Sequence, residues 1–474
     1  MTEPHPRTAS PIAVFDLGKT NSKMFVFSPT GAILQEVREK PLWTTFKDRK
    51  ILDDGRLFGW MRREVAEAVR LHGIGGVMVS AHGCTFALVR GHNTLLHPVL
   101  DYEQEVPDAI SAGFAAVRSP FAETFTPDLP LGLCYGRHVY WLSEVEPEIF
   151  AETEAILGYP QYWVWRFCGR QMSEYSYLGV HSHLWAPFGR DYSTMVDRLG
   201  WRSKLPLLVP AGVVAGSMEL DLEDGTHHRV DVHNGVHDTN AALSYYRMTG
   251  LSDFTLVSTG TWVVVINPAC PLDALDAERD MLCNVTVDGD PAPSLRFMGG
   301  RENDIIGQGW KAPVGRDVVE SLVARGIFAL PSWDAGGPFP ETRGVIVGGE
   351  VSGEERAALA ALYVTLMTDL ALDLIRCTND IVVDGGLTRI AIYTPMLAQL
   401  RPEQKVLCST TSEGTAIGAA ALAFAALELF PFKDETRLVV ASAVQGLEDY
   451  RTRWRDLADA ARRDARATHA REAA

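Results

Sequence analysis

The chain has 474 residues, of which 46% are hydrophobic and 22% are charged. These values are typical of a globular protein with an ample core, and the length allows two or three domains. With 44 basic against 60 acidic residues, the formal net charge is −16. Such an excess of negative charge disfavours nucleic acids and anionic membranes as partners, because both would repel the protein.

The cysteines and the apolar segments predict a cytoplasmic protein. The seven cysteines are scattered, odd in number and never in a C-x-x-C pair, which is typical of reduced thiols. The first seven residues are polar and lack the apolar core of a signal peptide. The longest apolar run, residues 419–427, is too short to span a bilayer and indicates a buried helix.

The N-terminal stretch predicts a β-hairpin with a polar turn. Two apolar runs within residues 12–27 flank the turn, and a third run at 32–37 extends them to an antiparallel meander. The turn offers backbone N–H groups and hydroxyls to a phosphate, while Asp16 is placed to reach a hydrated Mg2+. A decorated surface turn is the alternative. A P-loop is rejected, because Ala13 stands where its first glycine is required and a hairpin replaces the helix.

A buried strand at residues 75–80 leads to a second candidate site. His82 and Gly83 form the turn after this strand, and a glycine at a strand end permits close approach of a ligand. A satisfied structural histidine is the alternative for His82. Tyr102 and Glu103 follow in a loop that places polar groups beside an aromatic ring, which suits polyol recognition but is equally common in loops.

The middle of the chain carries the candidate catalytic base, Asp238. It follows the turn-forming pair Asn234-Gly235 and precedes the Ala-rich start of a helix. A carboxylate in a turn or a first helical turn is presented to a cleft, where it can accept a proton from a substrate hydroxyl. The alternative is that Asp238 only caps the helix.

Residues 135–201 are rich in aromatic side chains. Aromatic faces stack on sugar C–H surfaces, but most of these rings are predicted to be core. His181 and His183 have the spacing of a metal-binding pair, so a zinc hydrolase is an alternative function. No Asp or Cys cluster at ligand spacing accompanies them in the sequence, which disfavours zinc.

The second half of the chain begins like the first. Residues 254–266 predict a strand, a polar glycine turn and a second strand. The chain therefore predicts two lobes that each open with a hairpin able to hold phosphate oxygens, with the candidate base at their junction.

Three later segments complete the prediction. Residues 296–304 are expected to form a Gly-rich polar loop, and residues 354–376 a long apolar helix. The Gly385-Gly386 turn follows a strand and offers a ribose or a base a surface without side chains. Because this segment is not G-x-G-x-x-G, a Rossmann dinucleotide site is not supported.

The motifs and their order resemble those of the FGGY carbohydrate kinases of the actin-like ATPase superfamily. D-L-G-K-T-N-S-K stands near the N-terminus, H-D-T in mid-chain, S-T-G-T-W shortly after, D-G-G-x-x-R late and E-G-T-A-I-G-A-A near the end. Each motif alone is weak, but their order and spacing over residues 12–430 are specific. The pairing of H-D-T with G-T-W is most similar to the L-rhamnulokinase and L-fuculokinase branch.

The resemblance implies an α/β, ribonuclease H-like fold of two lobes. Each lobe would be a mixed five-stranded sheet flanked by helices, with the active-site cleft between the lobes. Residues 1–245 would form the N-terminal lobe, which binds the sugar and carries the first phosphate hairpin. Residues 246–474 would form the C-terminal lobe, which binds ATP and carries the second phosphate hairpin, the adenosine motif and a C-terminal helix.

The resemblance also implies roles for individual residues. Asp238 would be the catalytic base and, with Asp16, would lie by the Mg2+. The expected sugar contacts are His82, Gly83, Tyr102, Glu103, His237, Asp238 and Thr239. The expected ATP contacts are Lys19, Thr20, Asn21, Ser22, Lys23, Gly260, Thr261, Arg301, Gly385 and Gly386.

The implied activity is transfer of the γ-phosphoryl group of ATP to a hydroxyl of a ketose. A 6-deoxy ketohexose such as L-rhamnulose or L-fuculose is the first candidate. Lys19 departs from the family pattern, since many members carry a small residue there, and it adds a cation to the phosphate loop. The His82-Gly83 turn is similar to that of xylulokinase-like members, so a pentulose, tetrulose or polyol is the alternative substrate. A non-catalytic actin-like nucleotide-binding protein is a remote alternative, and the sequence leaves a homodimer open.

Overall fold

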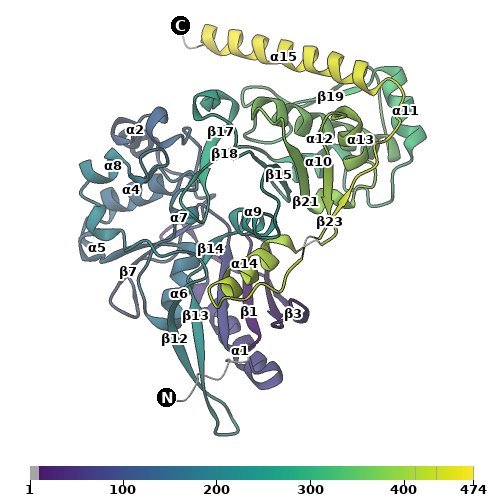
Figure 1. The fold of residues 1–474 in the computed structure, drawn as a ribbon. Helices are drawn as coiled ribbons and strands as arrows, with labels where there is room; N and C mark the ends of the chain where they lie inside the picture. Colours follow the sequence, from purple (N-terminus) through teal and green to yellow (C-terminus); the bar gives the residue numbers. More distant parts are fainter. Residues whose placement is uncertain (1–9, 412, 434, 473–474) are drawn as a thin grey trace. The chain divides into compact units, whose positions relative to one another are not determined.

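The structure, a computed structural model, describes residues 10–411, 413–433 and 435–472. Figure 1 shows the fold and labels many of its helices and strands. The chain divides into two compact units. Unit 1 contains the chain up to Gly250 with Cys283–Pro291 and Thr415–Asp434, and unit 2 contains Leu251–Leu282, Ala292–Gly414 and the chain from Glu435. The predicted polar N-terminal stretch lies outside the described residues. The assignment of separate functions to residues 1–245 and 246–474 stays a prediction.

The main sheet of unit 1 has seven strands, where five were expected. Six of them follow the order β12-β13-β6-β1-β2-β3, and β14 also pairs with β6. Their bounds are β1 Ile12–Leu17, β2 Ser22–Phe27, β3 Ile33–Glu39, β6 Gly76–Ala81, β12 Val214–Asp221, β13 His227–His233 and β14 Val236–His237. The antiparallel pairing of β2 with β1 and β3 confirms the predicted meander. The sequence does not indicate three of these strands. β14 has only two residues, and β12 and β13 contain too many charged residues to form apolar runs.

Three parallel strands of this sheet end at the same level. β1 pairs with β6 so that Leu17 lies opposite Ala81, and β14 pairs with β6 so that His237 lies opposite Ala81 as well. Since the carboxyl ends of neighbouring parallel strands meet at one edge, the turns that follow these three residues leave the sheet side by side.

Helices and three small sheets complete unit 1. The small sheets are β4 Trp43–Phe46 with β5 Arg49–Leu52, β7 Phe86–Arg90 with β8 Thr94–Leu95 and β9 Ala155–Gly158, and β10 Trp185–Ala186 with β11 Asp191–Tyr192. The helices are α1 Asp54–His72, α2 Asp108–Val117, α3 Phe121–Thr124, α4 Tyr135–Val145, α5 Pro147–Glu152, α6 Tyr159–Cys168, α7 Tyr175–Leu178, α8 Thr194–Arg198, α9 Asp238–Met248 and α14 Gly414–Ala425. Most aromatic rings of residues 135–201 are buried in this unit's core, as predicted.

Unit 2 repeats the strand, glycine turn and strand at the start of its own sheet. The order is β17-β18-β16-β15-β21-β22-β23, again seven strands and not five. Their bounds are β15 Phe254–Thr259, β16 Val263–Ile266, β17 Met281–Val285, β18 Pro291–Phe297, β21 Asp380–Gly385, β22 Val406–Ser409 and β23 Thr436–Leu438. β15 and β16 pair antiparallel, which confirms the second predicted hairpin, and β15, β21 and β22 run parallel. β23 has three mostly exposed residues, so the sequence gives no strand signal there.

The helices of unit 2 include one correction. They are α10 Gly299–Gly307, α11 Arg316–Arg325, α12 Glu354–Leu374, α13 Tyr393–Leu400 and α15 Leu447–Glu472, beside the small sheet of β19 Phe328–Leu330 and β20 Val345–Val347. The loop predicted at residues 296–304 is wrong, because β18 continues to Phe297 and α10 begins at Gly299. The helix predicted at 354–376 is confirmed as α12. Among the described residues it is the one helix long and apolar enough to cross a membrane, but most of it is buried against α10, α11 and α13, as in a core helix.

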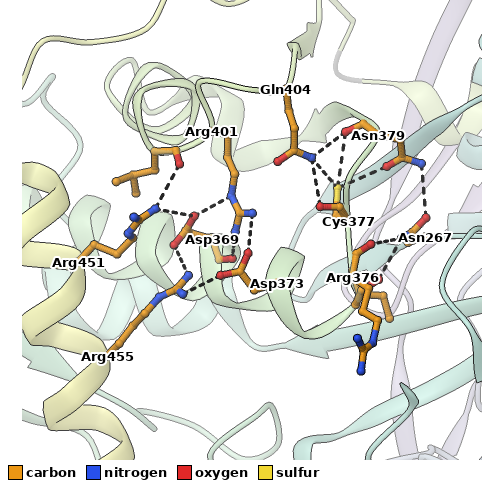
Figure 2. Close-up of polar contacts among 12 residues, drawn as sticks. Asn267, Asp369, Asp373, Arg376, Cys377, Asn379, Arg401, Gln404, Arg451 and Arg455 are labelled. Atoms are coloured by element: carbon orange, nitrogen blue, oxygen red, sulfur yellow. Dashed lines mark hydrogen bonds and ion pairs between the residues drawn. The ribbon is translucent and has the colours of Figure 1, made fainter. Parts of the chain in front are cut away.

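A buried ion network ties the C-terminal helix to unit 2 (Figure 2). Asp369 of α12 is fully buried, and its carboxylate lies 2.7 Å from Arg401 Nε and 2.5 Å from an Arg455 nitrogen of α15. A nitrogen of Arg451 lies 3.9 Å away. Asp373, one helical turn later, contacts Arg401 at 2.7 Å and Arg455 at 2.6 Å. The two carboxylates therefore join α12, α15 and the end of α13.

We predict that Asp369→Ala lowers the free energy of unfolding of unit 2 by about 3 to 5 kcal/mol, because the arginines lose their buried carboxylate. Asp373→Ala is the matched control. Its side chain is partly exposed, so it should cost less than half as much. Denaturant unfolding followed by tryptophan fluorescence measures both, and equal losses would contradict the central place of Asp369.

Candidate functional site

The edge of unit 1 where β1, β6 and β14 end gathers most of the predicted sugar and phosphate residues. Gly18 and Lys19 follow β1, His82 and Gly83 follow β6, and Asp238 follows β14. A Cβ on Gly83 would lie 3.2 Å from His237 Nε2. The structure thus brings the His82-Gly83 turn against the His237-Asp238 turn, although about 150 residues separate them in the chain.

Asp238 is the first residue of α9, and its carboxylate accepts two hydrogen bonds from Thr239 and lies close to the ring of His237. Oδ1 lies 2.6 Å from the Thr239 backbone nitrogen, 3.1 Å from Thr239 Oγ1 and 3.2 Å from His237 Nε2. The side chain is 31% exposed. The residue at the capping position is His237, but Asp238 accepts a hydrogen bond from the backbone nitrogen of Thr239 in the first turn, so the alternative that Asp238 stabilises the helix start stays open. All of these contacts are made by Oδ1, which leaves Oδ2 as the candidate oxygen for a substrate contact.

His237 lies beside Asp238. Asn240 Nδ2 donates to His237 Nδ1 at 3.0 Å, so the proton of the neutral ring is on Nε2, which lies 3.2 Å from Asp238 Oδ1. Burial lowers the pKa of His237, which keeps the ring neutral at pH 7. Nδ1 of His237 is thereby used within the protein, and a direct sugar contact of His237 stays a prediction.

His82 differs from a satisfied structural histidine. Its Nδ1 donates to the Gly83 carbonyl at 2.8 Å, and burial lowers its pKa to about 4. The neutral ring therefore carries its lone pair on Nε2, which is buried and has no hydrogen-bond partner among the described residues. A buried acceptor without a partner is costly, so this atom is a candidate contact for a ligand hydroxyl.

Lys19 extends from the first hairpin turn to the loop of Tyr102 and Glu103. Its Nζ forms an ion pair with Asp101 and lies 4.2 Å from the centre of the Trp43 ring and 4.4 Å from that of Tyr102. Glu103 Oε2 is 3.6 Å away. The side chain predicted to face phosphate thus lies among the residues predicted to hold the sugar.

The remaining residues of the first hairpin keep positions at or near the turn. Thr20 and Asn21 are exposed, whereas Ser22 is buried and its Oγ has no partner among the residues that the structure describes. Asp16 is half-buried and lies opposite Lys23 in the register of β1 and β2.

The corresponding edge of unit 2 is built from backbone. Gly260 and Thr261 form the exposed turn after β15, and Gly385 lies opposite Thr259 in the register of β21. A Cβ on Gly385 would clash with the Thr259 carbonyl oxygen, and one on Gly300 would clash with that of Gly260. The first turn of α10 therefore packs directly on the hairpin turn, and Gly386 is exposed beside it.

Arg301 of α10 is partly exposed and forms an ion pair with Asp334, from Nε to Oδ2, at 2.8 Å. Contact with a nucleotide would require this side chain to leave Asp334 or to use its free nitrogens. The structure places Arg301 one residue from the Gly300 contact, so it lies near the turn of Gly260.

Sequence reasoning missed several residues of the two edges. Asp101 and Trp43 hold Lys19, and Asn240 fixes the ring of His237. In unit 2, Thr259 Oγ1 donates to the Asp384 carbonyl at 2.6 Å and accepts from the Leu387 nitrogen at 3.1 Å, which fixes the Gly385-Gly386 turn. Thr259 and Asp384 stood within quoted motifs, and Asn240 is only three residues from His237. The contacts of Lys19 with Asp101 and of Thr259 with Asp384 join distant parts of the chain and leave no local signal.

The zinc alternative finds no support. His181 Nδ1 contacts the Leu133 carbonyl at 2.5 Å, and His183 Nδ1 lies 3.4 Å from Thr124 Oγ1. Among the described residues, no group of three His, Cys, Asp or Glu side chains gathers in a way that would hold a metal ion. A Mg2+ bound through one or two carboxylates and water does not require such a group.

Two comparisons establish the family. Residues 251–430 match the family model described as carbohydrate kinase FGGY, C-terminal domain. The solved structure of a carbohydrate kinase from Novosphingobium aromaticivorans is 32% identical, with a TM-score of 0.83, and the match covers 96% of this chain and 99% of that chain. The chain belongs to the FGGY carbohydrate kinase family.

More distant structures share the fold of this FGGY kinase. A ligand-bound xylulose kinase from Lactobacillus acidophilus is 14% identical, with a TM-score of 0.76 and coverage of 95% of this chain and 98% of that chain. A glycerol kinase from Plasmodium falciparum with ADP is 13% identical, with a TM-score of 0.74 and the same coverage. The predicted α/β fold with two sheet-rich lobes of the actin-like ATPase type is confirmed.

The FGGY kinase is thus an enzyme, and sugar kinases of its family use a sugar and ATP. A comparison of its sequence with curated proteins gives no match. These findings do not single out the rhamnulokinase branch, which stays a prediction.

Glu302 gives unit 2 a pH dependence. Its Oε1 lies 2.9 Å from the Trp333 nitrogen and 3.0 Å from the Tyr363 hydroxyl, and Oε2 is buried with no partner among the described residues. Burial raises the pKa of Glu302 from 4.5 to about 7. Because the carboxyl then loses its proton more readily in the unfolded chain, the stability of unit 2 falls as the pH rises through this range.

We predict that Glu302→Gln gains stability over the wild type by up to about 3 kcal/mol on going from pH 5 to pH 8. The amide stays neutral, so it does not suffer the cost of a buried charge at the higher pH. Urea unfolding of both proteins at the two pH values measures the difference. Asp304→Asn, on an exposed position of α10, is the control and should show no such gain, and a Glu302→Gln difference independent of pH would contradict the assignment.

Proposed function

We propose that this FGGY kinase transfers the γ-phosphoryl group of ATP to a terminal CH2OH of a ketose. L-Rhamnulose and L-fuculose, both 6-deoxy ketohexoses, are the first candidates. Pentuloses such as xylulose and ribulose, and tetruloses and polyols such as erythritol, are the second. The observation that carries the proposal is the carboxylate of Asp238. It is partly exposed, accepts two hydrogen bonds from Thr239 through Oδ1 and lies 3.2 Å from His237, whose ring borders the His82-Gly83 turn.

In the proposed reaction, Asp238 Oδ2 accepts the proton of the sugar hydroxyl as its oxygen attacks the γ-phosphorus. The bond from the γ-phosphorus to the β,γ-bridging oxygen breaks, and ADP leaves with that oxygen. His237 keeps the carboxylate in place through its Nε2 proton. His82 accepts a hydrogen bond from a second hydroxyl of the sugar and so orients the ketose.

The nucleotide would use both hairpin turns. Thr20, Asn21 and Ser22 in unit 1 and Gly260 and Thr261 in unit 2 would hold phosphate oxygens through hydroxyls and backbone N–H groups. The backbone of Gly385 and Gly386 would lie against adenosine. Such contacts neutralise and position the phosphates, which is most of what phosphoryl transfer requires.

Asp16 and Asp238 would hold a Mg2+ ion. They lie at the ends of β1 and β14, which both pair with β6, and Mg2+ is commonly bound by one or two carboxylates with water. When bound, the ion would neutralise phosphate charge. The excess of acidic residues makes that contribution necessary, since the chain as a whole repels a polyanion.

Two features support keeping the second group of substrates. The turn of His82 and Gly83 is similar to that of xylulokinase-like members, and several structures that share the fold are xylulose kinases. A cytoplasmic location and a homodimer complete the proposal. The remote alternative, a nucleotide-binding protein without catalysis, would leave the fixed carboxylate of Asp238 without a use.

We predict that Asp238→Asn lowers kcat by about 10²-fold or more, because the amide cannot accept the hydroxyl proton. The Kd for MgADP should change less than about twofold. Coupled ADP release and calorimetry measure these values. Asp224→Asn, in the exposed turn between β12 and β13, is the control with wild-type activity, and near-normal turnover of Asp238→Asn on the preferred sugar would refute the assignment.

We predict that one class of ketose accelerates ADP release from MgATP well above the rate without sugar. The panel contains L-rhamnulose, L-fuculose, xylulose, ribulose, erythrulose and erythritol, each read by a coupled assay. The preferred compound is then distinguished by kcat/KM. No acceleration by any compound would favour the non-catalytic alternative.

A further inference from the structure

The side chain of Lys19 turns away from the predicted phosphate loop. It leaves the turn after β1 and ends in a cage of two aromatic faces, Trp43 and Tyr102, and two carboxylates, Asp101 and Glu103. A cation over an aromatic face is attracted by the ring, and more strongly where water is excluded. Burial lowers the pKa of Lys19, and the ion pair with Asp101 opposes this shift.

Asp101 is the fixed point of the cage. Its side chain is fully buried, and it contacts Lys19 through Oδ1 and Lys50 through Oδ2, the latter at 2.7 Å. Burial alone would raise the pKa of Asp101, but the hydrogen bonds from the two lysines outweigh it and the pKa is lowered. Oδ1 also accepts from the Glu103 nitrogen at 2.9 Å. The carboxylate therefore sets the conformation of the loop that carries Tyr102.

Tyr102 connects this cage to the sugar site. The ring of Tyr102 contacts the ammonium group of Lys19. It also packs edge to face against the ring of His82, with the two ring centroids 5.4 Å apart. His82 in turn carries the buried acceptor that faces no protein donor among the described residues. A continuous set of contacts thus runs from Lys19 through Tyr102 to His82.

We propose that Lys19 is a positioning residue of the sugar site and not a ligand of the nucleotide phosphates. Its charge is balanced by Asp101, and its role is to hold the loop of Asp101 and Tyr102, and through Tyr102 the ring of His82. The phosphates are left to the hydroxyls and backbone of Thr20, Asn21 and Ser22. This inference rests on the proposed sugar kinase function.

The test compares Lys19→Met, Lys19→Arg and Asp101→Asn with the wild type. Methionine keeps the apolar stem between the two rings and removes the charge, whereas arginine keeps the charge. Lys405→Met is the matched control. Lys405 is an exposed lysine of unit 2 that directly precedes β22, so it lies at the end of this strand away from the glycine turns. The KM for the preferred sugar, the KM for ATP, kcat and the Kd for MgADP are measured, and thermal unfolding confirms that each variant is folded.

The expected result for Lys19→Met is a rise in sugar KM of about tenfold or more, with the MgADP Kd and the KM for ATP within about twofold of wild type. Lys19→Arg should recover part of the loss, and Asp101→Asn should raise the sugar KM in the same direction. A purely structural role would lower thermal stability without separating the two KM values. That pattern, or a tenfold loss of MgADP affinity with unchanged sugar KM, overturns the inference.

A failure of the proposed function gives a different pattern. If the wild type phosphorylates none of the sugars, the MgADP Kd of Lys19→Met still tests whether Lys19 binds the phosphates. An unchanged Kd supports the inference that other groups bind them, and a tenfold weaker Kd overturns that inference. The pairing of Lys19 with Asp101 is supported if Lys19→Met lowers thermal stability less in the Asp101→Asn background than in the wild type.

Discussion

The parallel pairing of β6 with β1 and with β14 is the constraint on which the candidate site depends. This register brings Leu17, Ala81 and His237 to one level, so that the following turns present Lys19, His82 and Asp238 together. A slip of one residue would exchange the two faces of a strand and turn Asp238 away from His82. In unit 2, the parallel pairing of β15 with β21 likewise brings Thr259 and Gly385 to the same level. In each unit, the strand register thus places the turns of the candidate site, and the side chains of those turns then determine its chemistry.

The two edges use that register in different ways. In unit 1 the turns carry charged and polar side chains, and their conformations are fixed by side-chain hydrogen bonds such as that of Asn240 to His237. In unit 2 the turns are bare, and glycines allow backbone to meet backbone at Gly300 and Gly385. Side-chain donors suit a sugar, whose hydroxyls differ in position, whereas exposed backbone suits phosphates and an adenosine that are the same in every reaction cycle.

The sequence predicted those parts of the fold whose causes are local. Both hairpins follow from apolar runs around a polar glycine turn, and the position of Asp238 follows from the Asn234-Gly235 turn before a helix. The helix at Gly299 was mistaken for a loop, because Gly299 and Gly300 indicate a turn unless one knows that a carbonyl of the neighbouring hairpin occupies the space of a Cβ. The pairing of Lys19 with Asp101 was not predicted, because it joins residues 82 positions apart and only the folded loop shows it.

The hydrogen-bond polarity of the two histidines narrows what the sugar must offer. His82 and His237 are both buried and neutral, yet His82 carries its proton on Nδ1 and His237 on Nε2, because Nδ1 contacts a carbonyl in His82 and the amide of Asn240 in His237. In the proposed reaction His82 Nε2 and Asp238 Oδ2 are therefore both acceptors. A ligand that satisfies them must bring two hydroxyl donors, one of which is phosphorylated. A carboxylate or phosphate group placed directly at His82 Nε2 would set two acceptors against each other, so this contact favours a hydroxyl of the ligand.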